Sequence, residues 1–154
     1  NLWIDNCYDD LVKIIKKVDL LMINDQEIQE LHDVQNVDLA ISKTFELGLE
    51  YIIVKMGSDG ALLVSKKGGK FKCPAVQIDK VIDPTGAGDS FAGGFMGYIA
   101  SKNNWSFDNL KKAVCWGTVM ASYCVENFGT ENIIQLNENA YKKRYSSLIN
   151  KIMS

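Results

Sequence analysis

The chain reads Asp83-Pro84-Thr85-Gly86-Ala87-Gly88-Asp89-Ser90-Phe91-Ala92-Gly93-Gly94-Phe95-Met96 at the junction between a β-rich stretch and a long apolar helix. The helix is predicted to carry a carboxylate, that of Asp89, in its first turn. The first N–H groups of a helix have no partners within it, and the helix dipole places partial positive charge there. Because Gly86, Ala87 and Gly88 are small, a phosphate can approach this backbone closely. We therefore predict an anion hole formed by these three residues.

The acid beside this anion hole needs an explanation, because the Asp89 carboxylate would repel a phosphate that was merely stored there. The pairing makes chemical sense if Asp89 takes a proton from a hydroxyl group while the hole holds the phosphoryl group under attack. That is the chemistry of a small-molecule kinase. The structural alternative is a glycine-rich turn that caps a core helix, with Asp89 compensating the helix dipole.

The whole stretch from Asp83 to Met96 resembles the second signature of the PfkB/ribokinase family of sugar and nucleoside kinases. The resemblance implies that Asp89 is the catalytic base and that Gly86-Ala87-Gly88 is the anion hole. It also implies transfer of the γ-phosphate of ATP to an alcohol group of a sugar, with Mg²⁺ as cofactor. Complete members are longer and this chain starts abruptly at Asn1, so we expect a carboxy-terminal portion without the lid.

The acceptor and the activity of this portion stay open. A nucleoside kinase of the adenosine type is an alternative, as is a vitamin kinase of the same superfamily. A further alternative is a nucleotide-binding or assembly module that has no turnover when isolated. Many family dimers pair through the lid, so a homodimer is an expectation for the complete protein only.

Two other segments resemble nucleotide-site motifs of the family. Asn24 and Glu27 follow a predicted strand and match an Asn-x-x-Glu motif, in which the acid helps to hold Mg²⁺ through water. A capping box, in which both side chains satisfy backbone N–H groups, is the structural alternative. Gly57 and Gly60 match a Gly-x-x-Gly segment beside the nucleotide phosphates, although a hairpin turn explains them equally well. Lys55 either reaches phosphate or is simply solvated.

The carboxy-terminal part supplies weaker candidates. Residues 119–130, with Ser122 and Gly129, resemble the helix and loop that line the adenine pocket, although core packing of a helix explains most of the pattern. Asp83, with carbonyl groups near Thr85 and Gly129, resembles the monovalent-cation loop that some members use for K⁺. The single histidine, His32, is expected at a helix end without a catalytic role.

Composition limits the classes of partner. The chain has 154 residues, of which 47% are hydrophobic and 23% charged, and its formal net charge is −2. We expect no nucleic-acid partner because there is no basic footprint, and no membrane partner because no apolar run reaches spanning length. The four cysteines fit no metal-ligand spacing, which favours reduced thiols and a cytoplasmic protein.

The periodicity of apolar residues predicts a single α/β domain over residues 1–154. Helices are predicted over residues 6–17, 25–31, 37–48, 87–101, 106–127 and 138–152, and strands over 18–23, 51–56 and 61–65, with extended chain over 71–73 and 75–81. This alternation predicts a three-layer α/β/α domain with a mainly parallel sheet and one antiparallel hairpin. Gly93 and Gly94 each cost about 1 kcal/mol of helix propensity, so we expect close packing of that helix against the sheet or a ligand.

Overall fold

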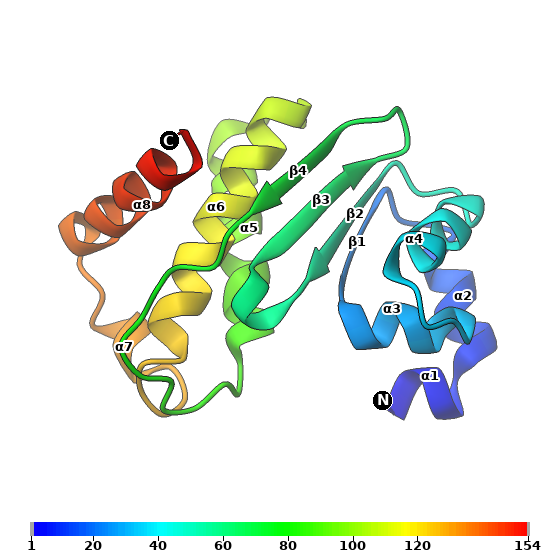
Figure 1. Ribbon diagram of the computed structural model, residues 1–154, viewed down its shortest axis with the longest axis horizontal. Coiled ribbons are helices and arrows are strands. Elements are labelled where there is room, and N and C mark those ends of the chain that lie inside the picture. Colours follow the sequence, from blue (N-terminus) through cyan, green and yellow to red (C-terminus); the bar gives the residue numbers. More distant parts are fainter. Residues whose placement is uncertain (1, 154) are drawn as a thin grey trace. The chain divides into compact units, whose positions relative to one another are not determined.

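The structure is a computed structural model that describes residues 2–153 (Figure 1). Its helices are α1 (Leu2–Asn6), α2 (Tyr8–Ile15), α3 (Asp25–His32), α4 (Val37–Glu46), α5 (Ala87–Lys102), α6 (Phe107–Cys124), α7 (Glu131–Ile134) and α8 (Glu138–Met153). Its strands are β1 (Leu20–Asn24), β2 (Tyr51–Lys55), β3 (Ala61–Ser65) and β4 (Lys70–Cys73), with a short 3₁₀ helix, η1 (Gly57–Asp59), after β2.

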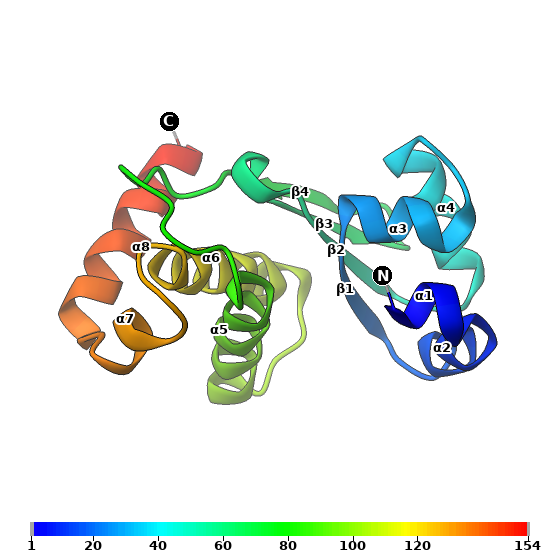
Figure 2. The ribbon, with the colours of Figure 1, turned by 90° about the horizontal axis from the view of Figure 1, so that it is seen from below.

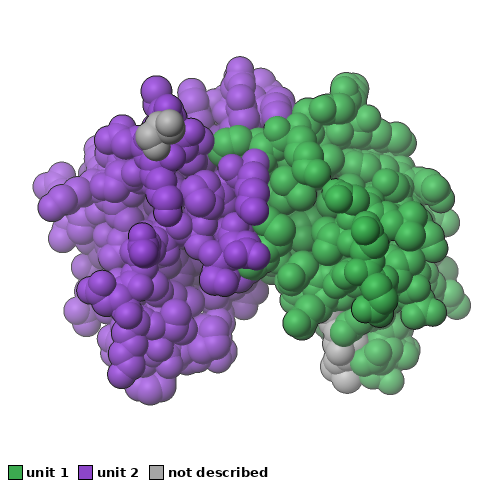
Figure 3. Space-filling view, viewed as in Figure 1, with its two compact units in different colours: residues 1–56, 62–71 green, residues 57–61, 72–154 purple. Residues whose placement is uncertain are grey.

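The chain divides into two compact units (Figure 3). The first contains residues 1–56 and 62–71, and the second contains residues 57–61 and 72–154. The prediction of a single domain over the whole chain stays a prediction.

The four strands form one sheet in the order β1-β2-β3-β4. β1 and β2 are parallel, with Leu20 opposite Tyr51 and Asn24 opposite Lys55. β2 and β3, joined by residues 56–60, are the predicted hairpin, and β3 and β4 form a further one, in which the Ser65 N–H donates to the Gly69 carbonyl at 2.7 Å. Strands joined by such short turns run antiparallel, as the arrows of Figure 1 show. The sheet is therefore mixed, with a smaller parallel share in residues 2–153 than the strand–helix alternation suggested.

The core of the first unit lies between one face of the sheet and the helices α2, α3 and α4. Ile52 and Val54 of β2 belong to this core. Its other buried members are Ile15, Ile23, Ile28, Leu31, Ala40, Ile41, Leu49 and Leu62. Ile53 and Leu63 point to the opposite face and are also fully buried. Burial on both faces is typical of sheets in α/β proteins and explains the continuous apolar run of β2.

The second unit is built around the contact of α5 with α6, and α8 packs against α6 (Figure 2). Gly94 of α5 allows the close approach, because a Cβ there would lie 2.9 Å from the Met120 Cβ and 3.1 Å from the Gly117 Cα. This confirms the predicted close packing at Gly94, whereas Gly93 has nothing within 4 Å of an added Cβ. On α8, the Tyr141 hydroxyl donates to the Trp116 carbonyl at 2.6 Å.

Most predicted elements are confirmed, with three differences. Within the predicted helix over 6–17 only residues 8–15 form a helix, α2, whose N-cap Cys7 makes no side-chain hydrogen bond, and α1 lies before that range except for Asn6. The helix predicted over 106–127 ends at Cys124, and α7 was not predicted. The four cysteines are free thiols, as predicted. No helix in residues 2–153 combines the length and the apolar character needed to cross a bilayer.

Candidate active site

The predicted anion hole lies on a tight turn that leads into α5. The Ala87 N–H donates to the Pro84 carbonyl at 3.2 Å, and Gly86 between them has φ 79° and ψ 0°. These values are those of a type II turn, whose third residue must adopt a positive φ, so glycine is required at Gly86. The helix then begins at Ala87, as predicted, and its first internal bond runs from the Ser90 N–H to the Gly86 carbonyl.

This turn corrects one part of the predicted anion hole. The Ala87 N–H is engaged by Pro84 and does not face a ligand, because it closes the turn. The N–H groups of Gly86, Gly88 and Asp89 have no hydrogen-bond partner in residues 2–153. The sequence signal for this hydrogen bond is the glycine at the third position of the four-residue turn.

Asp89 has the exposure that a proton acceptor needs. It lies in the first turn of α5, is exposed to solvent, and its carboxylate has no protein partner in the part of the chain that the structure describes. The side chain is therefore available to a ligand beside the unpaired N–H groups of Gly86 and Gly88. An orientation into the protein interior would have contradicted a catalytic role.

Asp83 anchors the start of the same turn. Its carboxylate accepts the Thr85 N–H at 2.9 Å, and hydrogen bonds from Thr85, and then from the Gly129 N–H, hold the pKa of Asp83 below its usual value. Its own N–H and that of Ile82 donate to the Val125 carbonyl, at 3.4 and 2.7 Å. Asp83 thus ties the turn to the segment that follows α6.

In the predicted monovalent-cation loop, the carbonyl groups of Thr85 and Gly129 both lie near the thiol of Cys124. The Cys124 Sγ lies 3.4 Å from the Thr85 carbonyl oxygen and 3.6 Å from that of Gly129. Cys124 is buried, and its single S–H proton can be donated to only one of these two oxygens at a time. Both carbonyl oxygens keep lone pairs, so the K⁺ site stays a prediction, and nothing in the spacing of the cysteines predicted this contact.

Asn24 and Glu27 form the capping box that was the structural alternative for them. The Asn24 Oδ1 accepts the Glu27 N–H at 2.7 Å, and the Glu27 Oε2 accepts the Asn24 N–H at 3.0 Å. This use engages one of the two Glu27 carboxylate oxygens and leaves Oε1 for a water or a metal-bound water. Lys55 lies opposite Asn24 in the β1–β2 register, so both residues lie at the carboxyl edge of the parallel pair.

The Gly-x-x-Gly segment is a turn with a close backbone approach. Gly57 has φ 52° and Gly60 has φ 93°, as a glycine turn requires. Gly60 is buried, and a Cβ there would collide with the Cys73 carbonyl oxygen. The turn therefore needs glycine at Gly60 for structural reasons alone, while Gly57 is exposed with open space around it, and its place beside a nucleotide stays a prediction.

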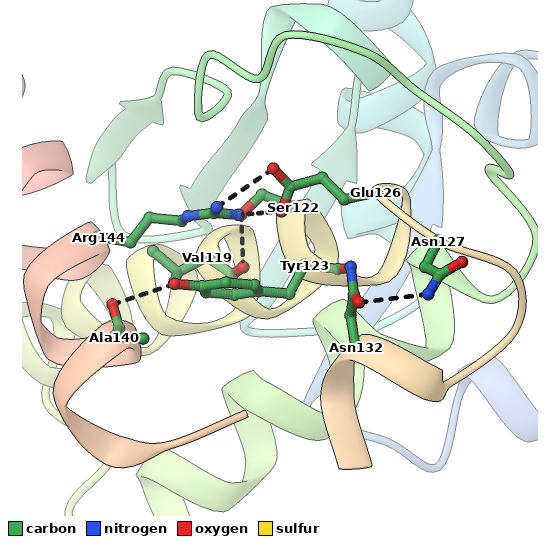
Figure 4. A network of polar contacts seen from close by, with 8 residues as sticks. All are labelled: Val119, Ser122, Tyr123, Glu126, Asn127, Asn132, Ala140 and Arg144. Atoms are coloured by element: carbon green, nitrogen blue, oxygen red, sulfur yellow. Dashed lines mark hydrogen bonds and ion pairs between the residues drawn. The ribbon is translucent and has the colours of Figure 1, made fainter. Parts of the chain in front are cut away.

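The hydroxyl group of Ser122 forms hydrogen bonds within the protein. Ser122 is 7% exposed, and its Oγ donates to the Val119 carbonyl at 2.6 Å and accepts from Arg144 at 3.0 Å (Figure 4). A direct hydrogen bond from this hydroxyl to a nucleotide is therefore not supported. Gly129 is exposed, with φ 56°.

Comparisons with known proteins place these features in context. The sequence profile described as pfkB family carbohydrate kinase matches residues 2–136. An uncharacterized sugar kinase of Archaeoglobus fulgidus is 33% identical over 121 residues, which are 78% of this chain and 45% of that protein. A nucleoside kinase of Methanocaldococcus jannaschii is 31% identical over 121 residues, or 79% of this chain and 37% of that protein. The chain thus spans less than half the length of these relatives.

Solved structures show the same fold. The aminoimidazole riboside kinase of Salmonella enterica, complexed with aminoimidazole riboside and an ATP analog, aligns with a TM-score of 0.81 at 24% identity, covering 93% of this chain and 47% of that one. A fructokinase of Vibrio cholerae, bound to fructose, ADP and calcium, aligns with a TM-score of 0.83 at 19% identity, covering 93% and 46%. These alignments confirm the predicted ribokinase-like fold.

Proposed function

This chain belongs to the pfkB family of carbohydrate kinases, and on that basis we propose that it carries the nucleotide-binding and catalytic portion of an ATP-dependent sugar or nucleoside kinase. The observation that carries the proposal is the solvent-exposed carboxylate of Asp89 beside the unpaired N–H groups of Gly86 and Gly88. These N–H groups have no partner in residues 2–153, so they are open to solvent or to the oxygens of a transferring phosphoryl group.

In this mechanism Asp89 accepts the proton of the acceptor hydroxyl as its oxygen attacks the γ-phosphorus of ATP. The bond between the γ-phosphorus and the β–γ bridging oxygen breaks, and ADP leaves with that oxygen. The N–H groups of Gly86 and Gly88, at the positive end of the α5 dipole, stabilise the charge on the transferring phosphoryl group.

Mg²⁺ fits the residues present, because it retains several waters and needs few protein carboxylates. Glu27 would hold it through water by the oxygen that the capping box leaves open, and the ion would neutralise charge on the nucleotide phosphates. A monovalent cation held by Asp83 and the carbonyl oxygens of Thr85 and Gly129 stays a prediction, because the single proton of the Cys124 thiol leaves lone pairs on both oxygens.

The acceptor is proposed only as a class. A sugar kinase and a nucleoside kinase are similar to this chain to nearly the same degree. A binding module without turnover is the alternative, because the chain spans less than half the length of these relatives. Calorimetric titration with Mg²⁺–ATP, beside a coupled assay over sugars and nucleosides, separates the two. Binding without product supports the module.

Replacing the proposed base tests the mechanism in a polypeptide that shows turnover. Asp89→Asn should lower kcat by about 10²–10⁴-fold with little change in nucleotide affinity, because a general base contributes about that much to the rate. Asp108→Asn is the matched control, since Asp108 is an exposed acid in the first turn of α6. An Asp89→Asn variant with the kcat of the parent protein would remove the mechanism.

A further inference from the structure

Arg144, the only arginine of the chain, makes a partly buried contact between α8 and the segment after α6 (Figure 4). Its Nη1 and Nη2 donate to the two carboxylate oxygens of Glu126 at 2.7 and 3.2 Å. Its Cζ lies 3.6 Å from the centroid of the Tyr123 ring. The side chains of Arg144 and Glu126 are only 23% and 27% exposed, so water and salt screen the pair less than a surface ion pair.

Glu126 lies beside the residues that hold the catalytic turn. The carbonyl of Val125, its neighbour, accepts the N–H groups of Ile82 and Asp83 at 2.7 and 3.4 Å. The Val125 N–H makes the last helical hydrogen bond of α6, to the Ala121 carbonyl at 3.2 Å, and no such bond follows from Glu126 in the described residues. The side-chain hydrogen bonds of Asn127 stay within residues 127–132.

We propose that Arg144 is a positioning residue for the turn that carries Asp89. Through Glu126 it fixes the Val125 carbonyl, which in turn fixes the backbone of Ile82 and Asp83, where the turn begins. Arg144 itself contacts no reacting atom. The positioning rests on the contacts above, and only its consequence for catalysis rests on the proposed function.

A purely structural role for Arg144, in attaching α8 to α6, is the competing explanation. The structure offers a matched control for it. The Tyr123 hydroxyl also joins these helices, donating to the Ala140 carbonyl at 3.0 Å, and it makes no other hydrogen bond in the described residues. Tyr123→Phe therefore removes an α6–α8 hydrogen bond and keeps the ring that Arg144 covers.

Amide hydrogen exchange at Ile82 and Asp83, measured by NMR on this chain, tests the positioning directly. Arg144→Met should speed exchange at both amides by about tenfold or more, the effect expected when a hydrogen bond to a charged group is lost. Glu126→Gln should act in the same direction, and the double variant should be no faster than Arg144→Met, because both changes break one contact. Tyr123→Phe should leave both amides unchanged.

Unchanged exchange at Ile82 and Asp83 in both Arg144→Met and Glu126→Gln overturns the inference. Should Arg144→Met fail to fold, Glu126→Gln alone decides, because it keeps the size and half of the acceptor capacity of Glu126. The same variants titrated with Mg²⁺–ATP separate this inference from the proposed function. Faster exchange with unchanged nucleotide affinity supports the positioning and counts against a nucleotide site at this turn, whereas faster exchange with weaker binding supports both.

Discussion

Gly60 shows how one residue can serve the fold at a position that also resembles a ligand motif. An added Cβ would meet the Cys73 carbonyl and lie 2.7 Å from the Ala75 N, and both are backbone atoms. Backbone atoms cannot rotate away as the end of a side chain can. The glycine is therefore required whether or not a nucleotide binds beside it.

Gly60→Ala should destabilise the chain by about 3 kcal/mol or more, because the strain of a positive φ is added to a backbone collision. Gly68→Ala is the control, since Gly68 has a similar φ of 98° but nothing within 4 Å of an added Cβ. It should cost only about 1–2 kcal/mol, the strain alone. Urea unfolding of the two variants measures the difference, and equal losses would show that the collision is relieved.

The contact between α5 and α6 explains why a helix with several glycines is still a helix. Gly94 meets Gly117 across the interface, and an added Cβ on Gly117 would lie 2.6 Å from the Phe91 carbonyl oxygen. The two backbones approach so closely that each helix needs a residue without a side chain at the crossing. Packing of this kind more than offsets the weak helix propensity of glycine.

Two neighbouring glycines of α5 should respond to alanine in opposite directions. Gly94→Ala should destabilise the chain by about 1–3 kcal/mol through overpacking against Met120 and Gly117. Gly93→Ala should stabilise it by about 0.5–1 kcal/mol, because that position is open and alanine favours the helix. Thermal unfolding of both variants checks the signs. A loss of stability at Gly93 would mean that its face is covered in solution.

The pH dependence of stability belongs to the molecule as a whole, because it sums over every group whose pKa changes on folding. His32 is one of these groups. Burial of its ring, and then the charge of Lys43, lower the pKa of His32 below 6.5, while Glu46 opposes them. Its Nε2 lies 2.8 Å from the Thr44 hydroxyl, which itself donates to the Ala40 carbonyl and so accepts from the ring.

This lowered pKa sets the sign of the effect. Below the ordinary pKa of about 6.5 the unfolded chain binds a proton that the folded chain does not, so stability falls as the pH drops from 6.5 through the folded pKa. The free energy of unfolding, measured in urea, should be lower at pH 5 than at pH 8. In His32→Gln the difference between the two pH values should be smaller. Asp83 acts in the same direction but in the acidic range, below the usual pKa of an aspartate. If the His32→Gln variant keeps the full pH dependence of the parent chain, other groups cause that dependence.

The features that the sequence predicted correctly are those that depend on residues close together in the chain. The start of α5 after Gly86 and the N-cap of α6 at Ser106 are of this kind, and so is Gly48 with its positive φ after α4. Turn and capping geometry involves about four consecutive residues, so the local pattern contains the whole cause. The same local information left Asn24 and Glu27 with two meanings, since a capping box and a metal-ligand motif use the same residues.

Only the tertiary structure decided which groups remain open to a ligand. The Cys124 thiol meets the Thr85 carbonyl 39 residues away, and Arg144 reaches Glu126 across 18 residues. No local pattern encodes such contacts, because they depend on how whole helices pack. The sequence could therefore locate Asp89 and its turn. The packing of α6 and α8 removed the Ser122 hydroxyl from the site, since buried polar groups must find partners within the protein.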